Sequence, residues 1–276
     1  MRIVVTGASG FLAPFVIGKL KSMGGDVVAV SRSRGSGFSS VSSYGDTPDG
    51  DVLVHLAQDN DRARVNTQPS SYAENAVAEM ETLASRYARV IYASSASLYG
   101  DRGLSPRKED DPVIAGDTYA RIKIGCEEVV LAHGCGVAVR LANLFGPGQS
   151  ENTVLSTILG QVSKSGPLVV RDDTPVRDFL WVEDAADCLV QMATGAPTGI
   201  FNVGSGIGTS VRELALQALD VLGQGDRAVV AAASAERLSI LVLDIQRTLA
   251  AWPWQPVVSV RDGLKRLLLV RGLKNS

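Results

Sequence analysis

Short apolar runs alternate with helical patterns along the first half of the chain. Five runs are too short for helices and too continuously apolar for exposed strands, and they cover residues 2–7, 26–31, 51–57, 89–95 and 137–143. Apolar residues recur at helical spacing between several of these runs, over residues 11–25, 72–88 and 118–134. Buried strands that alternate with helices predict an α/β fold with a doubly wound parallel sheet, covered by helices on both faces.

The alternation of predicted strands and helices changes at two places in the sequence. Residues 31–50 are rich in Ser and Gly and have little helical pattern, so we expect a short irregular crossover there. From residue 147 the segments become shorter. We therefore divide the chain into a main domain, 1–146, and a smaller lobe, 147–276, some of whose elements return to the main sheet. The lobe ends in a predicted amphipathic helix over residues 260–276.

A glycine turn, TGASGFLAP, follows the first predicted strand. Gly7 and Gly10 would let a phosphate approach the backbone, and the following helix would direct its N–H groups and dipole at the anion. Ala13 is small enough to pack the helix against the strand. Pro14 falls in the first helical turn, where its missing N–H costs nothing. The turn predicts a dinucleotide site, and a plain turn between strand and helix is the alternative.

The end of the second predicted strand bears on the choice of cofactor. An acidic residue there would bind the ribose hydroxyls of NAD, but this chain has Ser31, followed by Arg32 and Arg34. A guanidinium can hold a 2′-phosphate by charge-assisted hydrogen bonds. We therefore predict NADP, with NAD as the alternative. The arginines could also belong to a solvated loop.

Tyr119 and Lys123 stand four residues apart and share one face of a predicted helix. An ammonium beside a phenol stabilises the phenolate, so this tyrosine can exchange a proton with a sugar hydroxyl during hydride transfer. Ser95 ends the preceding strand, where its hydroxyl can orient the substrate oxygen. The pair alone is weak evidence, but its order behind a glycine turn is more specific.

Composition excludes several classes of function. The 276 residues carry 27 Lys and Arg against 29 Asp and Glu, a net charge of −2 that favours neither nucleic acid nor a membrane surface. The three cysteines, Cys126, Cys135 and Cys188, match no zinc or disulfide spacing, and with only two histidines we expect no metal site. The sequence shows no signal peptide and no apolar run long enough to span a membrane. We expect a cytoplasmic protein with reduced thiols.

These motifs, in this order, resemble those of the extended short-chain dehydrogenase/reductase family, the NAD-dependent epimerases and dehydratases that act on nucleotide sugars. The resemblance covers essentially the whole chain, through TGASGFLA, DVLVHLA, SSASLYG, TYARIK, VRLANLFGPGQ, RDFLWVEDAA and GIFNVGSG. It implies a Rossmann-type sheet, a C-terminal substrate-binding lobe, a nucleotide-sugar substrate and a homodimer.

The resemblance also implies roles for individual residues. The catalytic set would be Ser95, Tyr119 and Lys123, all three of them beside cofactor or substrate. The remaining cofactor contacts would come from Gly7, Gly10, Phe11, Leu12, Ser31, Arg32, Leu56, Ala57 and Asn75, the last near the nicotinamide half. Asn143 and Arg177 would bind the diphosphate of the substrate. Arg237 is a weaker candidate for the same role, and Asp46 for an adenine contact.

One departure from the family pattern narrows the reaction. Family 4,6-dehydratases carry Asp-Glu after the catalytic hydroxyl residue, whereas this chain has Ala96 and Ser97. Eliminating water needs an acid and a base, so we expect no 4,6-dehydratase.

Three functions remain open. In the first, NADPH reduces a 4-keto sugar nucleotide and Tyr119 supplies the proton; the Ser31–Arg32 pair favours this interpretation. In the second, a bound NAD oxidises and re-reduces C4, which gives a 4-epimerase. In the third, the chain binds a dinucleotide as a sensor without turnover.

Overall fold

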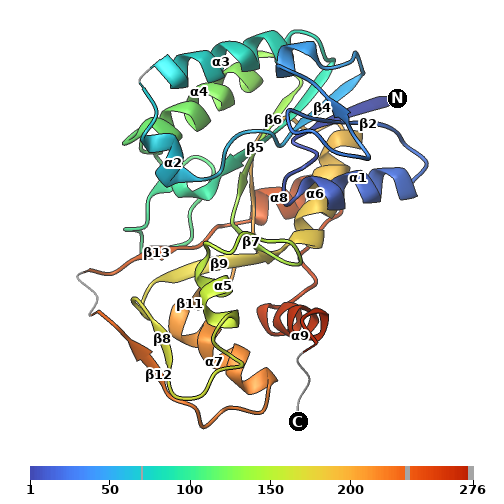
Figure 1. Ribbon diagram of the computed structural model, residues 1–276. Helices are drawn as coiled ribbons and strands as arrows, with labels where there is room; N and C mark the ends of the chain where they lie inside the picture. The colour runs from blue at the N-terminus through green and yellow to red at the C-terminus, as the bar shows by residue number, and fades with distance from the viewer. Residues whose placement is uncertain (70, 234–236, 273–276) are drawn as a thin grey trace.

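The computed structural model describes residues 1–69, 71–233 and 237–272, and its main feature is a seven-stranded parallel sheet (Figure 1). The strands lie in the order β10-β6-β5-β4-β1-β2-β3. Their bounds are β1 (Arg2–Thr6), β2 (Asp26–Ser31), β3 (Ser39–Ser40), β4 (Val52–His55), β5 (Arg89–Ser95), β6 (Gly136–Leu141) and β10 (Gly199–Val203). The chain runs outward from β1 on one side and then returns to β4 on the other. This reversal creates a crevice at the carboxyl ends of the strands, where ligands of such sheets bind.

Helices cover both faces of the sheet, as the alternating pattern predicts. One face packs against α1 (Ala13–Ser22), α6 (Val182–Thr194) and α8 (Gln246–Ala251). The other face packs against α3 (Ser71–Ala84) and α4 (Thr118–Ala132), with the short α2 (Arg62–Asn66) beside α4 (Figure 1). Each face buries its own cluster of Val, Ile and Leu side chains, and this burial is the main stabilising contribution. The predicted doubly wound α/β class is confirmed.

A second, smaller part lies against the carboxyl ends of these strands (Figure 1). Its strands are β7 (Asn143–Phe145), β8 (Leu168–Val170), β9 (Val176–Trp181), β11 (Gly208–Ser210), β12 (Val229–Ala231) and β13 (Ile240–Leu241). Its helices are α5 (Val154–Leu159), α7 (Val211–Val221) and α9 (Val260–Val270). They enclose a separate apolar cluster around Phe145, Phe179 and Trp181. Strand β9 pairs with β7, β11 and β13 and so forms the centre of this part.

Local details differ from the sequence pattern at several element boundaries. The crossover after β2 holds only the two-residue β3 and the single 3-10 turn η1 (Tyr44–Asp46), so no helix covers the sheet there. Helix α1 begins at Ala13, two residues later than the pattern predicts, and Pro14 lies in its first turn. The amphipathic tail helix ends at Val270, and residues 273–276 of that prediction lie outside the described residues.

Candidate active site

The glycine turn between β1 and α1 has the shape of an anion cradle. Gly7 has a φ of +76°, and a Cβ there would lie 2.6 Å from the carbonyl oxygen of Leu56. The Gly10 N–H donates to the Gly7 carbonyl over 2.8 Å and closes the turn. Within the described ranges, no side chain caps α1 and its first turn carries no acid. The free N–H groups and the dipole of α1 therefore face the turn, which fits the pyrophosphate of a dinucleotide.

Three serine hydroxyls gather where β2 ends beside this turn. The Ser9 and Ser31 hydroxyl oxygens are 2.8 Å apart, Ser9 also donates to Ser33 over 3.3 Å, and the Ser33 N–H donates to Ser31. Arg32 leaves the same strand end and stacks over the ring of Tyr44, 4.9 Å from its centroid. Hydroxyls and a guanidinium form a site that suits a phosphate, and it contrasts with the carboxylate that would bind unmodified ribose hydroxyls.

Ser95, Tyr119 and Lys123 lie around one cavity. Ser95 is the last residue of β5, and its hydroxyl lies 2.9 Å from that of Ser97 and accepts the Ser97 N–H. Tyr119 and Lys123 lie on α4, each less than a tenth exposed. The Lys123 ammonium donates to the Ala93 carbonyl over 2.7 Å and lies 5.8 Å from the Tyr119 ring centroid. The ammonium is thus held near the Tyr119 ring, and the two residues share one helix as the sequence predicts.

The start of α4 is fixed by contacts that hold Tyr119. Asp117 caps the helix by accepting the Ala120 N–H, and its carboxylate also accepts from Arg62 and Asn66 of α2. The Asn66 side-chain oxygen accepts the Tyr119 N–H over 3.0 Å. Helix α2 therefore helps to hold the tyrosine in place.

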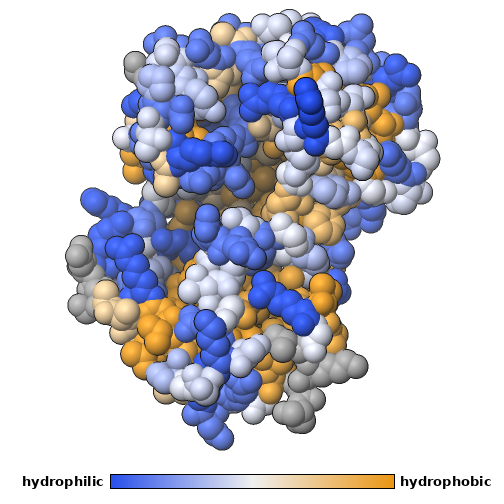
Figure 2. Space-filling model, in the orientation of Figure 1, coloured by the Kyte–Doolittle hydropathy of each residue, from blue (hydrophilic) through white to orange (hydrophobic). Residues whose placement is uncertain are grey.

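Three adjoining cavities follow the sheet's crevice, and a hollow between the two parts of the molecule is visible in Figure 2. The largest, about 770 Å³, contains the catalytic candidates together with Gly7, Gly10, Phe11, Leu12, Leu56, Asn143 and Arg177. A second, about 540 Å³, is lined by both glycines and by Ser9, Ser31, Arg32, Ser33, Leu56 and Ala57. The third, about 500 Å³, lies under η1 and α3. Their shared walls make one long groove that can hold a dinucleotide beside a second ligand.

Asn75 and Asp46 have different positions relative to this groove. Asn75 lines the third cavity, together with Arg32, Tyr119 and Lys123. Asp46 accepts hydrogen bonds from Ser42 and from the Ser43 N–H, which closes η1 as a capping box, and it lines none of the three cavities. The carboxylate of Asp46 therefore has a local structural role.

Arg177 projects from β9 toward the largest cavity and is already hydrogen-bonded. It pairs with Asp101 at 3.4 Å rather than with its sequence neighbours Asp178 and Asp184. Arg237 contacts the other oxygen of the same Asp101 carboxylate, at 2.9 Å. The sequence indicates both arginines as diphosphate candidates, but it gives no sign of their shared acidic partner.

Gln58, like Asp101, is a residue of the candidate site that the sequence did not indicate. It lines all three cavities, its amide nitrogen donates to Cys126 Sγ over 2.9 Å, and its amide oxygen accepts the Tyr92 hydroxyl proton. It directly follows the HLA motif, and that position is the one signal that could have indicated it.

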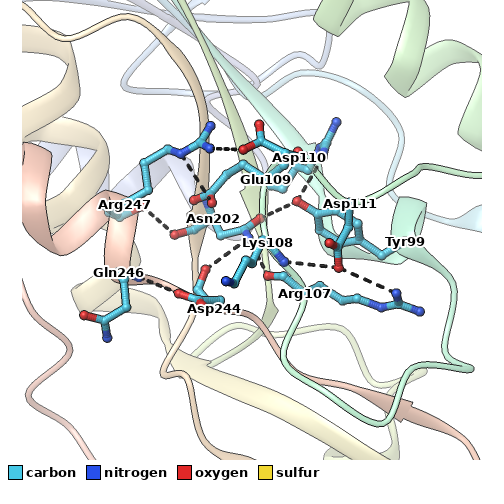
Figure 3. Close-up of polar contacts among 12 residues, drawn as sticks. Tyr99, Arg107, Lys108, Glu109, Asp110, Asp111, Asn202, Asp244, Gln246 and Arg247 are labelled. Atoms are coloured by element: carbon cyan, nitrogen blue, oxygen red, sulfur yellow. Dashed lines mark hydrogen bonds and ion pairs between the residues drawn. The ribbon is translucent and has the colours of Figure 1, made fainter.

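The loop from residue 100 to residue 117 joins Ser95 to Tyr119 and is held at its middle (Figure 3). Glu109 is buried and accepts the Asn202 N–H of β10 over 3.0 Å, and the Asn202 amide group donates to the Arg107 and Asp244 carbonyls. Tyr99 donates to the Asn202 amide oxygen over 2.8 Å. Burial raises the pKa of Tyr99 to about 12 despite nearby Arg140, so the hydroxyl keeps the proton that it donates.

A buried ion pair between Arg140 and Glu127 supports the loop of residues 100–117. The Arg140 guanidinium of β6 makes two hydrogen bonds to the Glu127 carboxylate of α4, at 3.0 and 2.7 Å. It also donates to Tyr99 and to the Glu109 carbonyl, while Ser94 donates to Glu127. This network joins the end of β5 to α4, the two elements that carry the catalytic candidates.

Within the part of the chain that the structure describes, no cluster of three or more His, Cys, Asp or Glu side chains is arranged to hold a metal ion. No helix in these described ranges is long and apolar enough to span a bilayer.

The chain is similar to known proteins over most of its length. The sequence model of the NAD dependent epimerase/dehydratase family matches residues 3–204. A UDP-glucose 4-epimerase from Mycolicibacterium smegmatis is 27% identical over 96% of this chain and 97% of its own. UDP-glucuronic acid decarboxylase 1 from Arabidopsis thaliana is 25% identical over 97% of this chain and 69% of its own. The solved structure of MoeE5 with UDP-glucose and NAD superposes with a TM-score of 0.82 at 24% identity, covering 99% of this chain and all of that one.

Proposed function

The chain belongs to the NAD dependent epimerase/dehydratase family, and from this premise we propose that it is an enzyme that transfers hydride to or from a nucleotide sugar. The reaction that we favour is reduction of a 4-keto sugar nucleotide by NADPH. The observation that carries the proposal is the arrangement of Ser95, Tyr119 and Lys123 around a cavity that also contains the glycine turn. In that arrangement Tyr119 would be a proton donor beside the cofactor and the sugar that such a reaction needs.

Each catalytic residue has a separate task in this proposal. Gly7 and Gly10 would hold the dinucleotide in the groove, and its nicotinamide would supply hydride chemistry when bound. Ser95 hydrogen-bonds the reacting sugar oxygen and orients it toward Tyr119. Tyr119 gives its phenolic proton to that oxygen during reduction, and the Lys123 ammonium, held by the Ala93 carbonyl, stabilises the phenolate that remains.

The preference for NADPH rests on the end of β2. Beside the glycine turn lie the guanidinium of Arg32 and the hydroxyls of Ser9, Ser31 and Ser33. These groups can donate hydrogen bonds to a 2′-phosphate. Asp59, an acid in the same cavity, is paired with Arg64 at 2.7 Å and so repels a phosphate less. A reductase must exchange its cofactor in every cycle, and NADPH is the cofactor that we assign to it.

A 4-epimerase is the second candidate, and the relatives favour it. The Mycolicibacterium smegmatis relative is named for that reaction, and MoeE5 was solved in complex with UDP-glucose and NAD. The same three catalytic residues serve both reactions, so the active-site geometry supports the two equally. Homodimer formation and a cytoplasmic location are further predictions drawn from the family resemblance and from the sequence.

Incubation of the purified protein with UDP- and dTDP-linked sugars and their 4-keto forms separates the candidates. A reductase consumes NADPH in proportion to product, which the nicotinamide absorbance measures. An epimerase converts its substrate without net change in that absorbance. The Y119F variant should lose roughly 10²- to 10⁴-fold in kcat in either case.

A dinucleotide sensor without turnover would give a different result. Wild type and Y119F would then be equally inert toward the whole panel, while both would still bind the cofactor in a fluorescence titration. That combination contradicts the enzyme proposal.

A further inference from the structure

Asp101 lies directly after the turn that follows Ser95, and it joins the two arginines that the diphosphate is expected to use. One carboxylate oxygen accepts from Arg237 over 2.9 Å, and the other accepts from Arg177 and from Ser239. Burial alone would raise the pKa of Asp101, but hydrogen bonds from Ser239 and Arg237 and the charges of Arg237 and Arg177 together outweigh burial, and its pKa lies below the ordinary value. The carboxylate is therefore an anion bound between two guanidinium groups.

The hydrogen bonds of Arg177 show why this anion matters. A guanidinium has five N–H donors, and four of them are on the two Nη atoms. Nη1 donates to the carbonyls of Val176 and Ser239, both at 2.9 Å, and Nη2 donates to Asp101 and to the Ser239 hydroxyl at 2.8 Å. All four Nη hydrogens thus have acceptors within the protein. A phosphate that enters the cavity can receive a hydrogen bond from Nη only if one acceptor leaves.

Asp101 is the acceptor that can leave most easily. Its contact to Arg177, at 3.4 Å, is the longest of the four, and two of the others are backbone carbonyls beside β9 and β13. Its backbone is anchored, because the Ile240 N–H donates to the Asp101 carbonyl over 2.8 Å. Rotation of one side chain, without any loop movement, would therefore free both arginines.

We propose that Asp101 is an internal counter-anion at the diphosphate site, and that the substrate's diphosphate displaces its carboxylate from Arg177 and Arg237. The inference rests on the proposed function, because it takes a nucleoside diphosphate as the ligand. A diphosphate carries more charge and more acceptor oxygens than one carboxylate and binds a guanidinium in the same forked geometry. Asp101 keeps the two cations paired without substrate and lowers the affinity for the ligand that replaces it. It is an affinity-determining residue of the site.

The test is the affinity for UDP, measured by calorimetric titration of the full-length protein. D101N removes the competing charge and should bind UDP about ten-fold tighter than wild type, since removal of one nearby like charge is worth about that factor. D101E keeps the charge and should bind more nearly as wild type does. D110N is the matched control. Asp110 is on the same loop, pairs with Arg247 and has a side chain that is 81% exposed, so the D110N variant should bind UDP with the wild-type affinity.

A second variant covers the case in which D101N folds poorly. S239A removes one hydrogen bond to Asp101 and one acceptor of Arg177, and it should also tighten UDP binding, by a smaller factor. If D101N and S239A bind UDP as wild type does or more weakly, while R177A weakens it, Asp101 only orients the arginines and the inference is wrong. If R177A leaves UDP affinity unchanged, the expected role of Arg177 as a diphosphate ligand is wrong instead.

Discussion

His55 is a buried histidine at the end of β4. It lies in the DVLVHLA strand, is 3% exposed, contacts the Thr6 hydroxyl through Nδ1, stacks on Tyr92 and meets the Tyr44 ring edge-on. Burial, with smaller contributions from the positive charges of Lys123 and Arg32, lowers the pKa of His55 from 6.5 to about 3. The imidazole is therefore neutral in the folded protein and protonates more readily in the unfolded chain.

This difference in pKa makes stability depend on pH. Between pH 6.5 and about 3 the unfolded state binds the extra proton, so His55 makes the free energy of unfolding fall as pH falls, by up to about 1.4 kcal/mol per pH unit. Denaturant unfolding of wild type and H55N across this window measures the contribution. H55N should show the shallower slope, and equal slopes would contradict the assignment.

Arg32 is the residue on which the expected preference for NADPH over NADH depends. R32A should weaken NADPH binding by about ten-fold or more, because one charge-assisted contact to the 2′-phosphate is lost, and should change NADH binding by less than about two-fold. Fluorescence titration measures both affinities. R34A, an exposed arginine outside the described cavities, serves as the matched control. Stronger binding of NADH than NADPH, unaltered in R32A, would favour the epimerase.

Helix α4 carries Tyr119 and Lys123, the proposed catalytic residues, and two separate contacts hold it in place. At the start, Asp117 caps it and α2 contacts it through Asn66. Farther along, Gly125 lets α3 approach closely, since a Cβ there would lie 2.6 Å from a Val77 methyl group. A loss of either support would displace Tyr119 and Lys123 relative to β5.

Removal of the α4 cap separates this role from plain stability. D117A should cost about 1–2 kcal/mol of unfolding free energy and should lower kcat more than it changes KM, because Tyr119 loses its alignment. S259A removes a cap of the same kind from α9 and should cost a similar free energy without the loss in kcat. Equal effects of both variants on kcat would show that the cap acts on stability alone.

Elements with a strong apolar pattern were predictable, and those fixed by tertiary contacts were not. Strands β1 and β5 are continuous apolar runs, so their burial follows from sequence alone. Helix α2 reads RARVN, with a single buried residue, Val65, and it depends on contacts to Asp117 that no local pattern reveals. Strands β12 and β13 have three and two residues, too few for a periodicity.

The candidate site likewise contains residues that the sequence predicts and residues that it does not. Tyr119 and Lys123 were predictable because their spacing on one helix is a property of the local sequence. Asp101 and Gln58 were not, because their importance comes from partners 76 and 68 residues away, Arg177 and Cys126. An acid in a loop is usually solvated, and only the fold brings two arginines to this one.

Asn202 joins the sheet, the loop of residues 100–117 and the segment before α8. Its side chain is fully buried and bonds to the Tyr99 hydroxyl and to the carbonyls of Arg107 and Asp244 (Figure 3). Thr248 of α8 donates to the Asn202 carbonyl over 2.6 Å. One amide thus satisfies buried polar groups from three regions of the sequence.

Replacement of this amide by an apolar side chain of similar size should be costly. N202L removes the acceptor of the buried Tyr99 hydroxyl proton and one donor each from the Arg107 and Asp244 carbonyls, and the free energy of unfolding should fall by about 2–5 kcal/mol in chemical denaturation. R247M removes a half-exposed ion pair from the same cluster and should cost about 1 kcal/mol or less. Similar losses in the two variants would contradict the central role of Asn202.

The late position of β10 also sets the order in which the chain can assemble. Ser95 and Tyr119 are synthesised early, but the loop between them is anchored by Asn202, more than 80 residues downstream of Tyr119. A nascent chain on the ribosome can build β1 to β6 while this loop still lacks its anchor. We therefore expect the proposed catalytic residues to be aligned only after β10 has emerged and paired with β6, so a ribosome-bound fragment that stops before residue 199 should hold a folded sheet around an incomplete candidate site.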